Sequence, residues 1–115
     1  MYRIGFYETE TGRSPVVDFL NEMSSKARAK FAQIAILLEE KGPEVQMPYS
    51  RHLEDGIFEV RVIVGKDSSR VLYFFLEEKR IVFTNGFKKK TQKAPKREIE
   101  TAIRYRADYI KRVKK

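Results

Sequence analysis

Three short runs of β-branched and aromatic residues follow one another in the second half of the chain and constrain its fold most strongly. The runs are IFEVRVIV at 57–64, RVLYFFL at 70–76 and RIVFTN at 80–85. Short polar segments separate them, and connections of this length join strands that are antiparallel neighbours. The sequence therefore predicts a three-stranded antiparallel meander.

Three other segments show apolar residues at the spacing of an amphipathic helix. The first starts at Ser14-Pro15, which is typical of an N-cap followed by a proline at the first helical position, and the second ends at Gly42-Pro43. The third has Pro95 at its first helical position, and one seam of it, apolar except for Arg106, consists of Ile99, Ile103, Arg106, Ile110 and Val113. Residues 2–8 predict a further strand, and residues 43–55, with two prolines, predict an irregular connection.

The expected order of elements is β-α-α-β-β-β-α, in a single domain over residues 1–115. Amphipathic helices must bury their apolar stripes, and an antiparallel sheet offers one apolar face for them. We therefore predict a small α+β domain of two layers, with the meander packed on the two N-terminal helices. The second face of the sheet then stays partly free, and we expect a functional site there.

Residue types that the chain lacks exclude several kinds of site. There is no cysteine, and His52 is the only histidine, so disulfides, thiolate metal sites and sites with two imidazoles are excluded. No P-loop, carboxylate cluster for Mg²⁺ or GxSxG motif is present, and we expect no cofactor. A lone histidine such as His52 is more often structural than catalytic. Without a long apolar run or a signal-peptide pattern, the chain is expected to be cytoplasmic.

The positive charge is concentrated in the last quarter of the chain. The net charge is +8, and residues 88–115 contain 12 basic and only three acidic side chains. Such a segment indicates a polyanionic partner, although a solubilising basic tail would have a similar composition. The apolar periodicity within this segment argues against a simple tail.

The predicted strands bring two arginines and a carboxylate to one surface. Because side chains alternate along a strand, Glu59 and Arg61 share a face, and Arg70 on the next strand can stand near Arg61. A solvated ladder of salt bridges would show the same pattern and would contribute little to stability.

The segment GFKKKTQKAP at 86–95 favours an anion-binding site. Its four lysines are Lys88, Lys89, Lys90 and Lys93. Four ammonium groups this close repel one another unless an anion lies among them, and the start of the following helix would add backbone N–H groups. Phe87 is an aromatic ring on which a splayed base could stack. With Arg61 and Arg70, these residues predict a basic groove for phosphate groups, and the pattern leaves catalysis open.

Three blocks of the sequence carry a family resemblance. They are HLEDGIFEVR at 52–61, RVLYFF at 70–75 and the lysine-rich GFKKKTQKAP at 86–95. Together they resemble the RelE/HigB superfamily of toxins, and more narrowly its phage-derived, Gp49-like (HigB-like) branch. The resemblance covers roughly residues 2–105, and it implies a RelE-like fold that agrees with the order of elements given above.

This resemblance implies the toxin of a type II toxin–antitoxin pair, usually a ribosome-dependent endoribonuclease that cuts mRNA and inhibits translation. The family's reaction is a metal-free attack of a ribose 2′-OH on the adjacent phosphate, which needs a base, cations and an acid. The implied partners are the ribosome, mRNA and a cognate helix-turn-helix, HigA-like antitoxin. DNA would be contacted only through the antitoxin complex, and no membrane is involved.

The resemblance also assigns roles to residues. Arg61 and Arg70 would bind and stabilise phosphate, Glu59 is the strand carboxylate placed to act as a base, and Lys88–Lys90 would hold phosphate or lower a neighbour's pKa. Many members carry a His-Tyr pair after the last strand, where this chain has Gly86-Phe87-Lys88. Lys89 is therefore the candidate acid, provided that neighbouring cations lower its pKa. Arg70→Ala should abolish toxicity. If Arg70 is exposed, this change should lower the free energy of unfolding by less than about 1 kcal/mol.

Two other classes of function stay open. One is a non-catalytic RNA- or phosphate-binding module that uses the same groove, and the other is a phage-derived protein-interaction subunit. The seam of the last helix would either dock a partner, such as an antitoxin, or cover the chain's own sheet. The cations expected on the outer face of this helix are Lys96, Arg97, Arg104, Lys111 and Arg112.

Overall fold

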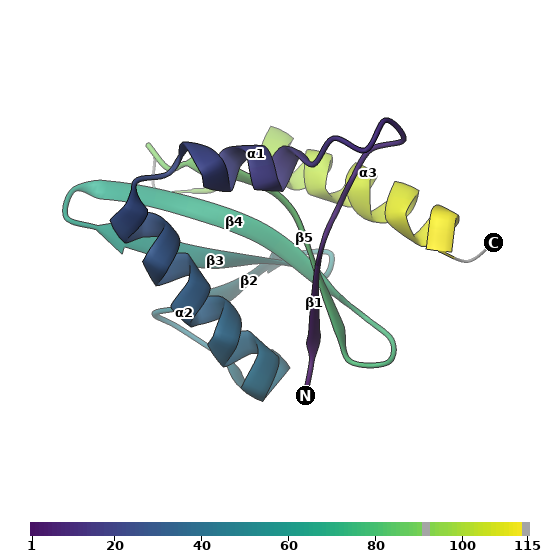
Figure 1. The fold of residues 1–115 in the computed structure, drawn as a ribbon, viewed down its shortest axis with the longest axis horizontal. Helices are drawn as coiled ribbons and strands as arrows, with labels where there is room; N and C mark the ends of the chain where they lie inside the picture. The colour runs from purple at the N-terminus through teal and green to yellow at the C-terminus, as the bar shows by residue number, and fades with distance from the viewer. Residues whose placement is uncertain (91–92, 114–115) are drawn as a thin grey trace.

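A five-stranded sheet forms the centre of the molecule in the computed structural model, which describes residues 1–90 and 93–113 (Figure 1). Its strands are β1 (Arg3–Phe6), β2 (Ser50–Glu54), β3 (Ile57–Val64), β4 (Asp67–Leu76) and β5 (Arg80–Lys88). The strand order is β1-β5-β4-β3-β2, with β1 parallel to β5 and every other pair antiparallel. The predicted meander is therefore confirmed, and it gains one strand at each edge.

The helices are α1 (Pro15–Glu22), α2 (Ser25–Lys41) and α3 (Lys96–Val113), with a short 3₁₀ turn, η1 (Gly42–Glu44), after α2. The Ser14 hydroxyl accepts a hydrogen bond from the backbone N–H of Val17, as expected of an N-cap. Gly42 has a φ of 53°, and a Cβ there would lie 2.3 Å from the ring of Tyr2, so this position suits only glycine. No helix in the described part of the chain is long and apolar enough to cross a membrane.

One face of the sheet packs against α1 and α2. The buried side chains shared by these helices and the strands are Val16, Met23, Phe31, Ile34, Leu38, Val60, Val62, Val71, Tyr73, Ile81 and Phe83. The predicted stripes of both helices thus meet the apolar face of the meander. The α+β class and the packing of the meander on the two N-terminal helices are confirmed.

Helix α3 packs on the opposite face and runs towards the C-terminus at the right of Figure 1. Its Ala102 is fully buried in a cluster that includes Ile57, Leu72 and Phe74, and Ile103 packs against this cluster. Ile99, one turn earlier, is 8% exposed. The first half of this seam therefore covers the chain's own sheet, whereas Val113 at its end is 45% exposed. The face that we expected to stay partly free is closed where α3 lies, so the helix adds a third layer there.

The segment 43–55, expected to be an irregular connection, contains a strand. Residues of β2 pair with β3, so that Ser50 lies opposite Val60 and Arg51 opposite Glu59. Both prolines, Pro43 and Pro48, lie outside this strand, and its sequence SRHLE has no apolar alternation that would reveal it. This segment becomes a strand because it pairs with β3, and its own sequence gives no sign of that pairing.

Candidate functional site

The register of the sheet places the predicted site residues side by side on the face that carries α3. Arg61 of β3 lies directly opposite Arg70 of β4, and Arg70 lies opposite Phe87 of β5. Glu59 is two residues from Arg61 along β3 and faces the same way. The structure thus brings Glu59, Arg61 and Arg70 together as the alternation of side chains predicts.

A buried carboxylate lies between two guanidinium groups at the centre of this site. Glu59 has no exposed surface, and its two carboxylate oxygens lie 3.3 Å from Arg70 Nε and 3.3 Å from Arg51 Nη2. Arg70 is itself 3% exposed, whereas the Arg51 side chain is 46% exposed. Sequence reasoning missed Arg51, because only the pairing of β2 with β3 places it beside Glu59.

Several polar atoms in this group have no hydrogen-bond partner among the described residues. They are Glu59 Oε1 and Oε2, Arg61 Nε and Arg70 Nε, and all are buried. The ion pairs of Glu59 are longer than the usual charge-assisted hydrogen bond, so part of the hydrogen-bonding capacity of these charged groups stays unused. The Glu59 oxygens are acceptors that would repel an anion, and Arg70 Nε faces one of them, so Arg61 Nε is the atom of this set that is suited to bind an anion or a water.

Arg70 is held in place by β4 itself. Its Nη1 atom donates to the Ser68 hydroxyl at 2.8 Å and to the Ser69 carbonyl at 3.0 Å. Burial lowers the pKa of Arg70, and the nearby Glu59 carboxylate opposes this effect. A guanidinium group stays charged at neutral pH despite such a shift, so Arg70 provides a fixed positive charge.

Lys89 completes the group of cations. Its backbone N–H donates to the Ser68 carbonyl at 2.8 Å, which continues the ladder beyond β5. Burial lowers the pKa of Lys89, and the charges of Arg70, Arg51 and Arg61 lower it further, while Glu59 raises it. These arginines therefore lower the pKa of Lys89, and the sequence had not assigned them this effect.

The other three lysines of the 86–95 segment are exposed. Lys88 is the last residue of β5, Lys90 follows the strand, and Lys93 lines an open pocket near the start of α3. The sequence between them, residues 91–92, lies outside the described residues. Their expected phosphate contacts stay predictions.

Phe87 does not present the ring surface that base stacking requires. Its side chain is 8% exposed and packs in the cluster beneath α3. A β-bulge between the pairs Leu72–Asn85 and Tyr73–Phe83 inserts Thr84, which turns Phe87 towards α3. The expectation that Phe87 stacks on a base is therefore wrong for this structure.

Gly86 lies within β5, and a Cβ at this position would lie 2.3 Å from the Phe19 ring of α1. Close packing of α1 on the sheet, and not a need for backbone freedom, explains the glycine.

The proposed role of Glu59 as a base also conflicts with its surroundings. A carboxylate with no exposed surface, flanked by Arg51 and Arg70, has no access to a substrate hydroxyl in this structure. Its geometry instead suits a positioning residue, which holds the two guanidinium groups at a fixed separation. A buried carboxylate that orients cations is a common supporting element of an anion site.

His52 has the structural surroundings expected of a lone histidine. Its Nε2 atom accepts a hydrogen bond from the backbone N–H of Gly56 at 3.2 Å, and its ring meets that of Phe58 edge-on. Within residues 1–90 and 93–113, no group of three or more His, Asp or Glu residues is placed to hold a metal ion.

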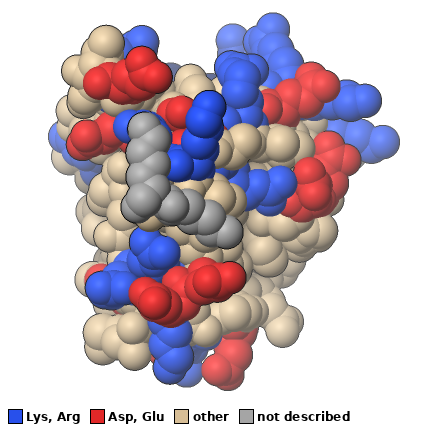
Figure 2. Space-filling view, turned by 90° about the vertical axis from the view of Figure 1, so that its right-hand side faces the viewer, with Lys and Arg blue, Asp and Glu red and all other residues tan. Residues whose placement is uncertain are grey.

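The basic excess of the last quarter of the chain is only partly available on the surface. Arg106 pairs with Asp55 at 3.2 Å, and Arg112 contacts the carbonyl of Glu8 besides pairing with Asp108 of the same helix at 2.9 Å, so these two arginines join α3 to other segments. The exposed cations of this helix are Lys96, Arg97, Arg104 and Lys111. Figure 2 shows a face on which Lys and Arg are interspersed with Asp and Glu. Surface charge on that face is therefore mixed.

Comparison with known proteins identifies a family. A model of phage-derived Gp49-like proteins matches residues 18–107, which include the cluster around Glu59 and most of α3. No curated protein sequence matches the chain. The family match spans well over half of the sequence and agrees with the α+β fold. The chain therefore belongs to the phage-derived Gp49-like family, a RelE-like family associated with the toxins of toxin–antitoxin pairs.

Proposed function

We propose that this domain is a HigB-like toxin of a type II toxin–antitoxin pair and that it cleaves mRNA on the ribosome. Family membership supports the toxin role. The observation that carries the nuclease role is the group formed by Arg51, Arg61, Arg70 and Lys89 around the single buried carboxylate of Glu59. Four cations around one anion give the site a net positive charge. A site that binds the negatively charged phosphodiester requires such a charge.

Cleavage through the ribose 2′-OH develops negative charge on the non-bridging oxygens of the phosphate. Arg61 would bind these oxygens, and Arg70, which lies opposite Arg61 on β4 and is 3% exposed, would add its positive charge from beneath the surface. Fixed cations that need no reorganisation stabilise such charge more effectively than mobile ones. Glu59 would contribute by holding Arg51 and Arg70, and not by touching the RNA.

The leaving 5′-oxygen requires a proton as the P–O bond breaks. Lys89 is the candidate donor, because burial and the arginine charges lower its pKa towards the range in which an ammonium group is a useful acid. The attacking 2′-OH would lose its proton to solvent water, and the products would be a 2′,3′-cyclic phosphate and a 5′-hydroxyl. No step of this reaction uses a metal or another cofactor.

The proposed function implies specific partners. A cognate helix-turn-helix antitoxin would block the toxin, and DNA would be reached only through that complex. The ribosome and mRNA place the site of action in the cytoplasm, and the chain would act as one domain over residues 1–115. A non-catalytic RNA-binding module is the second candidate, since the same cations would bind phosphate without cleaving it.

Induction of the chain alone in bacteria tests the proposal. We expect growth arrest, with new 5′ ends mapping within translated mRNA, and we expect a co-expressed antitoxin to relieve the arrest. Lys89→Met keeps a long side chain without the proton and should remove cleavage. Lys66→Met is the matched control, because Lys66 is exposed in the β3–β4 turn, away from Glu59.

The outcomes separate the candidates. Growth arrest without mRNA cleavage would favour the non-catalytic module. Normal growth with folded protein confirmed by immunoblot and solubility would contradict the toxin role.

A further inference from the structure

We infer that the pocket between β2 and the start of α3 binds one nucleotide of the RNA, next to the phosphate held by the arginine cluster. This inference rests on the proposed function, because one RNA strand must occupy both places. The pocket has a volume of about 510 Å³ and is lined by Arg51, Leu53, Glu54, Lys93, Ala94, Lys96 and Ile99. The volume is within the range of small-molecule sites, which is large enough for a nucleoside monophosphate.

Arg51 makes the pocket continuous with the candidate site. Its side chain lines the pocket, and its Nη2 atom lies 3.3 Å from the buried Glu59 carboxylate, which in turn contacts Arg70. A phosphate bound at the arginine cluster and a group bound in the pocket would therefore both lie close to Arg51. Neighbouring nucleotides of a single strand have this relationship.

The lining matches the two chemical parts of a nucleotide. Leu53, Ala94 and Ile99 supply apolar surface, against which the flat face of a base can pack. Arg51, Lys93 and Lys96 supply positive charge for a phosphate, and Lys96 is the first residue of α3, where backbone N–H groups also favour an anion. A free inorganic anion would use only the second part of this lining.

Glu54 argues against an acidic peptide as the occupant. Its carboxylate lines the same pocket and would repel the side chains of a partner rich in Asp or Glu. The amino group on the edge of a base can instead donate to a carboxylate, as cytosine does to Asp and Glu in known recognition modes. The charge pattern therefore favours a nucleotide over an acidic protein segment.

Titrations of the isotope-labelled protein by NMR test the inference directly. The probes are inorganic phosphate, ribose 5-phosphate, adenosine 5′-monophosphate and a hexaglutamate peptide, at equal ionic strength. The backbone amide signals of Leu53 and Ile99 report on the pocket, and those of Arg61 and Arg70 report on the arginine cluster. We expect the nucleotide to shift both groups and to bind at least about fivefold more tightly than ribose 5-phosphate, because only the nucleotide has a base.

A charge-reversal pair supplies the matched variants. Lys96→Glu should weaken nucleotide binding about tenfold, because it places a second carboxylate in the pocket. Lys111→Glu makes the same change on an exposed lysine in the last turn of α3, roughly 22 Å further along the helix, and should change binding less than about twofold. Circular dichroism of both variants checks that the helix is intact.

The result also distinguishes this inference from the proposed function. If phosphate and nucleotide shift Arg61 and Arg70 equally while Leu53 and Ile99 stay unchanged, the pocket assignment is overturned and the phosphate site stands. If hexaglutamate shifts Leu53 and Ile99 more strongly than the nucleotide, the pocket is a protein-binding site. If no probe affects either group, both assignments fail.

Discussion

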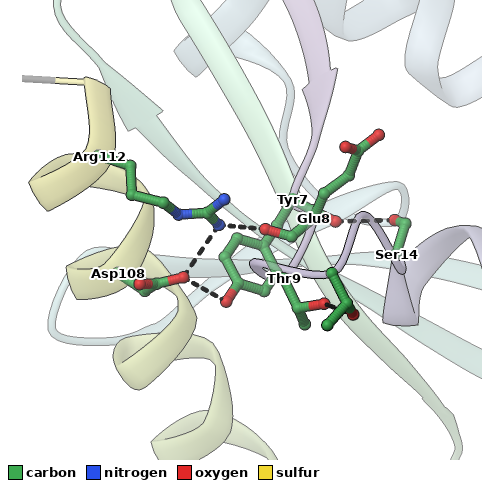
Figure 3. Close-up of polar contacts among 7 residues, drawn as sticks. Tyr7, Glu8, Thr9, Ser14, Asp108 and Arg112 are labelled. Carbon is green, nitrogen blue, oxygen red and sulfur yellow. Dashed lines mark hydrogen bonds and ion pairs between the residues drawn. The ribbon is translucent and has the colours of Figure 1, made fainter.

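The hydroxyl of Tyr7 donates a 2.6 Å hydrogen bond to Oδ2 of Asp108, which joins two residues that lie 101 positions apart in the chain (Figure 3). Arg112 donates to the same oxygen at 2.9 Å and also contacts the carbonyl of Glu8. The Tyr7 ring stacks on Tyr105 of α3 at 4.5 Å between centroids. This network fixes the C-terminal half of α3 to the segment after β1, so Arg112, expected on the outer face, has a structural role.

We predict that Tyr7→Phe lowers the free energy of unfolding by about 1 kcal/mol, because it removes one partly buried hydrogen bond and keeps the ring. Urea unfolding followed by circular dichroism measures the change. Tyr2→Phe is the control, since its hydroxyl makes no hydrogen bond among the described residues and its ring packs against Phe75. Equal losses for both variants would contradict the importance of the Tyr7–Asp108 bond.

The stability of the protein should fall between pH 10 and pH 12. Burial, followed by the hydrogen bond to Asp108, raises the pKa of Tyr7 from 10.0 to about 12, and burial raises the pKa of Tyr73 to about 12. The folded protein then binds more protons than the unfolded chain in this interval, so the stabilisation is complete below pH 10 and is lost as the pH rises towards 12. Urea unfolding across this range should show a shallower decline for Tyr7→Phe, and an identical decline would refute the assignment.

Arg70→Ala should destabilise the protein strongly, which reverses the expectation from the sequence. Arg70 is 3% exposed and faces the fully buried Glu59, so its removal leaves a buried carboxylate with Arg51 as its remaining ion-pair partner. Breaking a buried pair in this way typically costs about 3–5 kcal/mol. The expected loss is at the lower end of this range, because Arg51 stays in place. Loss of toxicity in this variant would therefore not by itself identify a functional arginine.

The double variant Glu59→Gln/Arg70→Met separates the two effects. It removes the buried negative charge together with its partner, so it should recover part of the stability lost in Arg70→Ala. Its toxicity should stay low, because the phosphate cation is still absent. A double variant that is less stable than Arg70→Ala would show that the carboxylate is not the cause of the loss.

Cleavage should decline at alkaline pH as Lys89 loses its proton. Burial and the charges of Arg70, Arg51 and Arg61 lower the pKa of Lys89, so an acid at this position loses its proton below the usual pH for lysine. Lys89→Arg should reduce the rate by about 10²-fold and remove this decline, because a guanidinium group keeps its proton. Cleavage by purified protein on programmed ribosomes, followed from about pH 6 to pH 10, gives the profile. An unchanged profile in Lys89→Arg would exclude Lys89 as the acid.

Exposed cations of α3 should control how antitoxin and ribosome binding depend on salt. The double variant Arg97→Ser/Lys111→Ser removes two exposed charges from this helix, and Lys26→Ser/Lys66→Ser removes two exposed charges elsewhere. We expect the first variant to reduce the slope of log affinity against log salt for at least one partner, and the second to leave it unchanged. Equal slopes in both variants would show that the charge of α3 is only solvating.

Local sequence was sufficient for the meander and for the face that carries its charged residues. The alternation of side chains has a period of two, so the shared face of Glu59 and Arg61 follows from adjacent positions in one strand. Short polar turns fixed the antiparallel neighbour, which brought Arg70 opposite Arg61. The lysine-rich block after the last strand was visible for the same reason, since all of its members lie within one segment.

Tertiary structure decided the rest, because each remaining feature depends on partners that are distant in sequence. Arg51 reaches Glu59 only when β2 pairs with β3, and no local pattern marks that strand. The bulge at Thr84 reverses the faces at the end of β5 and buries Phe87 beneath α3. The position of α3 depends in part on the bond between Tyr7 and Asp108, which joins opposite ends of the chain. The alternation of side chains within one segment gives no information about such long-range contacts. The burial of Glu59 and Arg70 could therefore be known only from the tertiary structure.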